Sequence, residues 1–174
     1  MQKHVNSWNA LALALAAPFV AAAVGAVATN SSVSTWYQHL RKPSWNPPAW
    51  VFAPVWNTLY LLMGVASWLV WRKREEKQGW FGLGGSEQRD RVDDALQLYG
   101  VHLVFNALWS VLFFGLRRVD WALAEILLLW GVILSTLTRF YRIDKWAGWL
   151  LVPYQLWATF AAFLNFTIWR MNRD

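Results

Sequence analysis

Five long apolar segments, separated by polar connections, constrain this chain more than any other feature. They cover about residues 8–28, 49–71, 95–116, 119–141 and 146–169. Each is long enough to cross the hydrocarbon core of a bilayer, which takes about 20 apolar residues per helix. Each is also apolar around its whole circumference, which suits contact with lipid better than a soluble bundle. The sequence therefore predicts an all-α integral membrane bundle of five transmembrane helices, forming a single domain over residues 1–174.

The composition supports a membrane protein. Of the 174 residues, 57% are hydrophobic and 15 are tryptophan, more apolar surface than a soluble domain of this length can bury. Several tryptophans, such as Trp8, Trp71 and Trp146, lie near segment ends, where indole rings anchor helices at membrane interfaces. The net charge of +6 comes from basic residues clustered between the apolar runs, so we expect anionic lipid headgroups as partners and no nucleic acid.

The first apolar segment has two interpretations. Lys3 and His4 precede it and residues 26–28 read Ala-Val-Ala, so a cleavable signal peptide is one alternative. The apolar run is longer than a typical signal sequence, which favours a transmembrane helix. Small residues also repeat along it at four-residue spacing, as expected for close packing between helices in lipid: Ala17, Ala21, Gly25 and Thr29.

Residues 72–94 form the longest connection, and they are charged and rich in glycine. This composition predicts a solvated linker, with a surface turn of helix within it as an alternative. Most Lys and Arg residues fall in the N-terminal tail, in this linker and in residues 139–145. The positive-inside rule then favours a cytoplasmic N-terminus.

Residues 40–56, LRKPSWNPPAWVFAPVW, combine proline and tryptophan at the start of the second segment. Asn46 is a good helix N-cap, and Pro47 and Pro48 suit a first helical turn. Pro54 falls inside the helix and should kink it, which leaves a gap beside the neighbouring helices. A gap lined by tryptophan makes a flat apolar pocket. The alternative is a surface turn with interfacial anchors.

Polar and aromatic residues share faces of several predicted helices. The stripes are Trp56, Tyr60 and Met63 in the second, His102, Asn106 and Trp109 in the third, and Trp157, Ala161 and Leu164 in the fifth, with Trp121, Ala124 and Glu125 opening the fourth. Because polar groups in lipid must face the bundle interior, these stripes predict a polar and aromatic interior. Plain interhelical hydrogen bonding by Asn57, Asn106 and Asn165 is the alternative, and it is preferred for Asn165.

Four stretches together resemble one known family. They are WYQHLRKPSWNPPAWVFAPVWNTLYLLMG from Trp36, FNALWSVLFFG from Phe105, WALAEILLLW from Trp121 and VPYQLWATFAAFLNF from Val152. The chain resembles the TspO/MBR family of tryptophan-rich sensory proteins and translocator proteins, also called peripheral-type benzodiazepine receptors, over about residues 8–170. The resemblance implies a five-helix bundle, commonly a homodimer, with a pocket roofed by the loop between the first two transmembrane helices.

The resemblance also implies a ligand. Members bind porphyrins such as protoporphyrin IX, and some bind sterol-like ligands and synthetic drugs. The matching pocket residues are Tyr37, Trp56, Asn106, Trp109, Trp121, Ala124, Trp157, Ala161 and Leu164. We expect the carboxylates of a porphyrin at the basic mouth near Arg41 and Lys42. A dedicated sterol site is not predicted, because Phe166 stands where the family's sterol motif has tyrosine.

The favoured function is a membrane receptor or transporter for tetrapyrroles, with a sensing or regulatory role and no cofactor or metal. The alternative is an enzyme that degrades porphyrin oxidatively in light, a reaction that the resemblance associates with Trp56 and Trp157. The sequence shows no hydrolytic triad, phosphate-binding loop or metal-ligand cluster, and its three histidines are scattered, so axial haem ligation by His102 is not favoured. The expected location is a bacterial cell membrane, with an outer membrane as the alternative.

Overall fold

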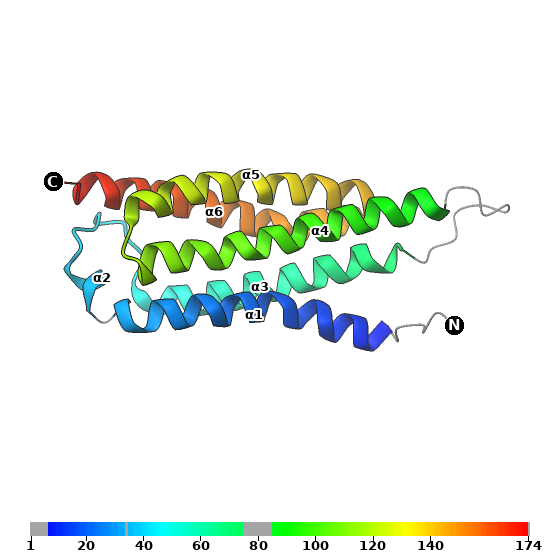
Figure 1. Cartoon of the computed structure of the whole chain (residues 1–174), viewed down its shortest axis with the longest axis horizontal. Helices are drawn as coiled ribbons and strands as arrows, with labels where there is room; N and C mark the ends of the chain where they lie inside the picture. Colours follow the sequence, from blue (N-terminus) through cyan, green and yellow to red (C-terminus); the bar gives the residue numbers. More distant parts are fainter. Residues whose placement is uncertain (1–6, 34, 75–84, 174) are drawn as a thin grey trace.

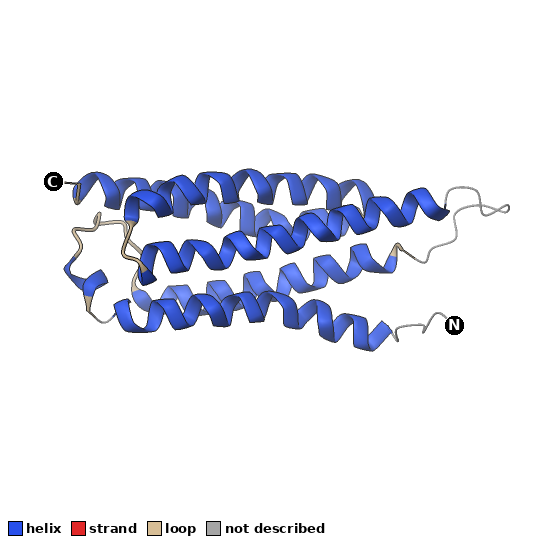
Figure 2. Cartoon of the chain, in the orientation of Figure 1, coloured by secondary structure: helices blue, strands red, loops and turns tan. Residues whose placement is uncertain are grey.

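The computed structural model describes residues 7–33, 35–74 and 85–173, and these residues form helices and connecting loops without a strand (Figure 2). Five long helices make the bundle: α1 (Ser7–Val33), α3 (Ala49–Arg72), α4 (Gly85–Ser110), α5 (Val119–Ile143) and α6 (Lys145–Met171). The short α2 (Trp36–His39) follows α1, and the π-helix η1 (Val111–Gly115) continues α4. Five spans are long and apolar enough to cross a membrane, which confirms the predicted fold class.

The long helices lie side by side, with α5 against α6 and α4, and α1 against α3 and α4 (Figure 1). One end of the bundle carries α2, residues 40–48 and the C-terminal end of α6, and we call it the lid end. The other end carries the start of α1 and of α4, and we call it the closed end. The start of α1 and the end of α6 therefore lie at opposite ends of the bundle, as an odd number of spans requires.

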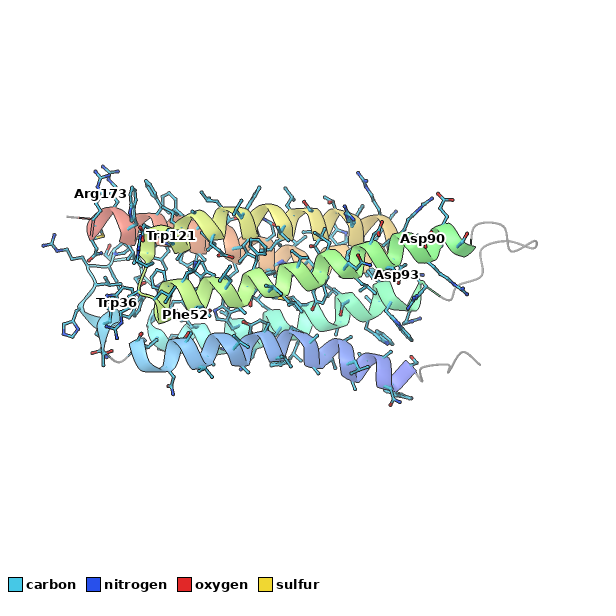
Figure 3. All side chains as sticks on the ribbon, in the orientation of Figure 1. Trp36, Phe52, Asp90, Asp93, Trp121 and Arg173 are labelled. Atoms are coloured by element: carbon cyan, nitrogen blue, oxygen red, sulfur yellow. The ribbon has the colours of Figure 1, made fainter. Side chains whose placement is uncertain are left out.

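The bounds of the helices agree with the predicted segments within a few residues, except for α4. This helix begins at Gly85, so the prediction of a linker is wrong for residues 85–94, while residues 75–84 lie outside the described part. The polar first turns are held by an ion pair between Arg91 and Glu87 and by Arg74, which donates to Asp93 at 2.9 Å. Asp93 lies at the closed end in Figure 3. Hydropathy missed these turns because they extend past the apolar run.

The start of α3 also differs from the prediction. The N-cap position is Pro48, with an extended backbone, so both prolines precede the first turn instead of forming it. The side chain of Asn46 does not cap the helix, because its Oδ1 accepts from the Tyr37 hydroxyl at 3.1 Å and its Nδ2 donates to the Pro47 carbonyl at 3.0 Å. The N-cap prediction is therefore wrong, and Asn46 instead ties the loop to α2.

Close approaches by glycine pack α1 into the bundle. A Cβ on Gly64 of α3 would lie 2.9 Å from Leu15 Cα and 3.0 Å from the carbonyl oxygen of Ala14. A Cβ on Gly25 of α1 would lie 3.0 Å from the hydroxyl of Ser110. The first segment thus packs as a helix of the bundle. Of the predicted small residues, Gly25 is buried against Ser110 and Ala21 packs on the core, whereas Ala17 is exposed.

Candidate functional site

A cavity of about 890 Å³ lies inside the lid half of the bundle. Its walls come from α1, α3, η1 and the lid-end halves of α4, α5 and α6, and its roof comes from residues between Tyr37 and Pro48. This volume falls in the range of roughly 300–1,000 Å³ that small-molecule sites occupy. Figure 3 labels Phe52, one of the wall residues, near this end.

Most of the predicted pocket residues meet at this cavity. Seven line it: Tyr37, Trp56, Asn106, Trp109, Trp157, Ala161 and Leu164. The other two, Trp121 and Ala124, do not line it and lie on an exposed face of α5. Trp121, which Figure 3 labels, is 60% exposed, and the guanidinium of Arg118 lies 5.5 Å from its ring centre. The stripe of α5 that faces the bundle runs instead through Ala122, Ile126 and Leu129.

Aromatic rings form much of the cavity wall. The ring of Trp56 stacks on Tyr60 at 5.3 Å and meets Trp157 edge-on at 6.4 Å between centroids. On the opposite wall Trp109 stacks on Phe113 at 5.0 Å. Such a surface presents flat apolar faces from at least three helices, which suits a planar ligand.

A hydrogen-bonded floor closes the cavity toward the middle of the bundle. The Tyr60 hydroxyl donates to Asn106 Oδ1 at 3.2 Å, and Asn106 Nδ2 donates to the Tyr154 hydroxyl at 2.7 Å. These bonds join α3, α4 and α6 and confirm interhelical bonding by Asn106. His102 lies outside the cavity lining, fully buried, with its ring 5.1 Å from that of Tyr154 and 5.4 Å from that of Tyr99. Its imidazole therefore does not reach a ligand in this cavity.

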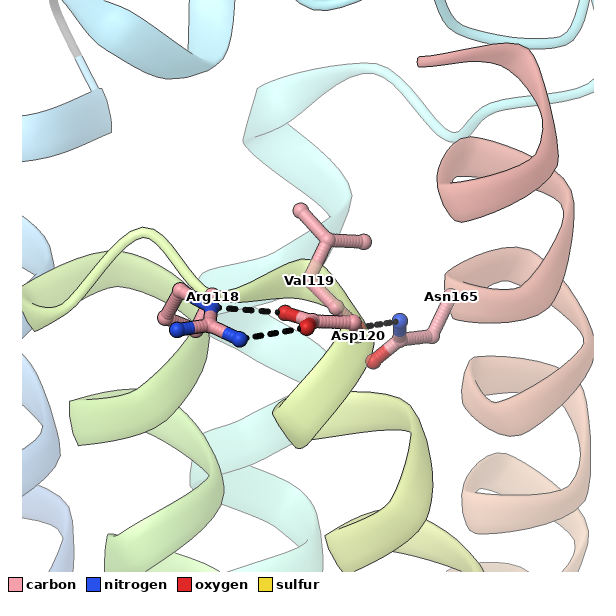
Figure 4. Close-up of polar contacts among 4 residues, drawn as sticks. All are labelled: Arg118, Val119, Asp120 and Asn165. Atoms are coloured by element: carbon pink, nitrogen blue, oxygen red, sulfur yellow. Dashed lines mark hydrogen bonds and ion pairs between the residues drawn. The ribbon is translucent and has the colours of Figure 1, made fainter. Parts of the chain in front are cut away.

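Asn165 joins three helices at the lid end. Its Oδ1 accepts from the indole N–H of Trp109 at 3.1 Å, and its Nδ2 donates to the carbonyl oxygen of Val119 at 2.9 Å. Figure 4 shows the second bond beside the ion pair of Arg118 with Asp120. The predicted interhelical role of Asn165 is confirmed, and the bond fixes the plane of the Trp109 ring. Asn57 lies on the cavity wall.

The roof rests on aromatic contacts. Trp36 and Tyr37 of α2 pack on η1, with ring centroids 5.8 Å from Phe113 and 5.6 Å from Phe114 respectively. Ser32, near the end of α1, donates to the carbonyl oxygen of Phe114 at 2.7 Å. A π-helix inserts an extra residue per turn, and π-helical segments often occur at functional sites. Here η1 turns two consecutive phenylalanines toward the roof.

Of the two basic residues expected at the mouth, Lys42 lines the cavity and Arg41 does not, and the expected position of the ligand carboxylates stays a prediction. Lys42 lines the cavity, but its ammonium donates to the carbonyl oxygens of Tyr37, Gln38 and Leu40 at 2.6, 3.2 and 3.1 Å. An ammonium has three donors, so these bonds leave Lys42 acting on a ligand as a charge and not as a donor. Burial raises the pKa of the Tyr37 hydroxyl further above physiological pH, where a tyrosine hydroxyl is already neutral.

The fold and the cavity define a multi-pass helical membrane protein with an aromatic chamber at one end, roofed by the loop after its first span. The chain belongs to the TspO/MBR family, whose model matches residues 14–170. It is 42% identical over 154 residues to a tryptophan-rich sensory protein of Cereibacter sphaeroides, covering 87% of each chain. It is 39% identical over 156 residues to the human translocator protein, covering 90% of this chain and 86% of that one.

A third relative, the tryptophan-rich protein TspO of Chlorobaculum tepidum, is 38% identical over 162 residues, with 93% of this chain and 95% of that protein covered. Relatives named as sensory and translocator proteins support a receptor or sensor role in a membrane. The predicted family and the multi-pass membrane location are thus confirmed.

Proposed function

We propose that this protein binds a tetrapyrrole such as protoporphyrin IX in the lid-end cavity, as a receptor or transporter. The observation that supports this most directly is the shape and lining of the cavity. Its walls carry Trp56, Trp109 and Trp157 within about 890 Å³. A flat apolar macrocycle gains contact area against indole faces, while the charge of Lys42 at the mouth favours ligand carboxylates.

The proposal is tested by titrating the purified protein with protoporphyrin IX, haem and cholesterol in turn, and following tryptophan fluorescence. We expect saturable quenching by the porphyrin. Trp109→Ala should weaken protoporphyrin binding by about 1–3 kcal/mol, because it removes a stacked aromatic contact and its buried area. Trp121→Ala is the matched control, since it removes the same side chain from the exposed face of α5.

Three outcomes of that titration are informative. Equal losses in the two variants would place the ligand outside the cavity, and unchanged affinity in a folded Trp109→Ala protein would move the site elsewhere. Saturation by cholesterol alone would replace the tetrapyrrole by a sterol-like ligand.

The homodimer expected from the resemblance stays a prediction, and the mass of the protein in detergent tests it.

A second candidate function is light-dependent oxidative degradation of porphyrin. Trp56 and Trp157 support it, because both line the cavity and their rings lie 6.4 Å apart. Indoles are readily oxidised, and a bound porphyrin excited by light can react with dioxygen beside them. An enzyme should convert many porphyrins per chain under illumination, and Trp157→Phe should slow this strongly while keeping most of the binding. A yield that stops at or below one product per chain would exclude turnover.

A further inference from the structure

The side chain of Asn172, directly after the end of α6, attaches the roof of the cavity to this helix. The main-chain N–H of Arg41 donates to Asn172 Oδ1 at 3.0 Å, and Asn172 Nδ2 donates to the carbonyl oxygen of Arg41 at 2.9 Å. Asn172 and Arg41 are 131 positions apart in the sequence, so these bonds join the first connection to the C-terminal end of the bundle. We propose that Asn172 is a positioning residue that holds the roof closed and thereby sets how fast a ligand leaves.

The chemistry of the amide explains why asparagine stands at this position. A primary amide offers an acceptor and two N–H donors, so it can pair with both polar groups of one peptide unit or residue. The second donor of Asn172 is also used, because Nδ2 reaches the carbonyl oxygen of Ile168 at 2.8 Å. That bond to the preceding turn of α6 fixes the amide in the orientation that receives Arg41. Neither alanine nor a carboxylate reproduces this set of bonds.

The bonds act at the middle of the roof, next to Leu40, which packs on the apolar cluster of Phe113, Ala122, Leu164 and Ile168. The first part of the roof, α2, rests on Phe113 and Phe114 of η1. The later part is held by Trp45, whose ring stacks on Phe163 at 5.7 Å. Between them, Asn172 supplies the hydrogen bonds that connect the main chain of residue 41 to a helix. Removing them leaves this part of the roof held by side-chain packing, which allows its main chain to move more easily.

Helix α6 connects Asn172 and its bonds to Arg41 with the cavity wall. Toward its other end from Asn172, α6 places Leu164, Ala161 and Trp157 along the cavity. A ligand that packs against this wall therefore contacts the element that holds the roof. This inference rests on the proposed function for its effect on the ligand, whereas the attachment of the roof can be measured with no ligand present.

The first experiment measures the roof alone. Because the chain has no cysteine, Ser44→Cys carries a single spin label on an exposed roof position. We expect Asn172→Ala to add a mobile component to the spectrum of this label. Two controls should leave the spectrum unchanged: Met171→Ala alters an exposed neighbour, and Arg41→Ala removes a side chain whose main chain makes the bonds. An unchanged spectrum in Asn172→Ala, or an equal change in Arg41→Ala, would overturn the proposal.

The second experiment measures release of protoporphyrin IX from the same proteins by displacement. Losing two main-chain hydrogen bonds should speed release about tenfold in Asn172→Ala, with little change in Met171→Ala. A mobile roof with unchanged release would refute the role in ligand exit. Failure of the unaltered protein to bind protoporphyrin would refute the proposed function instead, while the label would still report whether Asn172 holds the roof.

Discussion

The two halves of the bundle are built from the same helices but packed for different purposes. In the closed half, side chains such as Met63, Val92 and Phe140 are fully buried in a continuous apolar core. In the lid half, large rings stand around a cavity and a folded loop covers it. We therefore expect stability and ligand binding to depend on different halves of the bundle, so that a substitution in one half changes one property and spares the other.

Contacts at the closed end show how that half achieves its density. Gly148 of α6 lies so close to α5 that a Cβ on it would be 2.5 Å from Tyr141 Cβ. Asp144 caps α6, because its Oδ1 accepts from the main-chain N–H groups of Trp146 and Ala147 at 2.9 and 3.1 Å. A capped start and a glycine contact bring α5 and α6 together along their shared connection. The lid half instead spaces its helices with indole and phenyl rings.

Among the variants that distinguish the two halves, Phe140→Ala is expected to lower the free energy of unfolding most. Phe140 is fully buried in the closed half, so its truncation leaves a void and should lower the free energy of unfolding by about 3–5 kcal/mol. Affinity for protoporphyrin should stay unchanged in the fraction that is folded. Thermal unfolding in detergent and a porphyrin titration check the two parts. The matched variant Phe160→Ala alters the cavity wall, and we expect it to change affinity more than stability.

The next largest loss of stability is expected at the close contact between α5 and α6. Gly148→Ala forces a Cβ against the Cα and Cβ of Tyr141 at 2.7 and 2.5 Å, where the main chain cannot simply turn aside. Overpacking of this kind should cost about 1–3 kcal/mol of unfolding free energy. Gly131→Ala is the control, because a Cβ there meets nothing within 4 Å and alanine favours a helix. Equal melting temperatures for the two variants would contradict the tight α5–α6 contact.

The sequence predicted the part of the fold that depends on local composition. Five spans follow from apolar length, and the inward faces of α3, α4 and α6 follow from helical spacing and the resemblance. Tyr154 was missed, although it lies three residues before Trp157, and extending that stripe by one turn finds it. The two outward residues, Trp121 and Ala124, show the limit of transferring a pocket by motif, since the rotation of α5 depends on its neighbours.

Other features had no signal in the sequence. A π-helix at residues 111–115 and the pairing of Asn172 with Arg41 both depend on contacts between distant segments. Asn46 was misassigned as an N-cap because its competing partner, the hydroxyl of Tyr37, comes from another element. The lid end was thus harder to predict than the closed end, because its geometry is set by single polar contacts and not by apolar periodicity.

Asn165→Leu is expected to affect stability and porphyrin binding together. The substitution removes an acceptor from the Trp109 indole and a donor from the Val119 carbonyl, and interhelical bonds in lipid contribute about 1 kcal/mol. We expect a small loss of stability together with weaker porphyrin binding, because the Trp109 ring is no longer fixed. In a double-mutant cycle with Trp109→Ala the losses in affinity should not add. Additive losses would mean that Asn165 acts on the ligand independently of Trp109.

The smallest effect concerns the prolines of the roof, Pro47 and Pro48. Both precede the first turn of α3, and the carbonyl oxygen of Pro48 already accepts from the N–H of Val51 at 3.0 Å, a bond that alanine at position 48 would keep. Replacing both by alanine should therefore leave the start of α3 unchanged and lower the melting temperature by only about a few degrees. The substitution removes the stiffness of the two prolines. The unfolded chain then gains conformations, which lowers the free energy of unfolding by about 0.4–1 kcal/mol per proline. We expect faster proteolysis within residues 40–50 and a release of protoporphyrin a few times faster, both smaller than the changes in Asn172→Ala. Limited proteolysis and ligand displacement measure these rates side by side. Wild-type values in both assays would show that the hydrogen bonds and ring contacts hold the roof on their own, and that the prolines serve only the entry into α3.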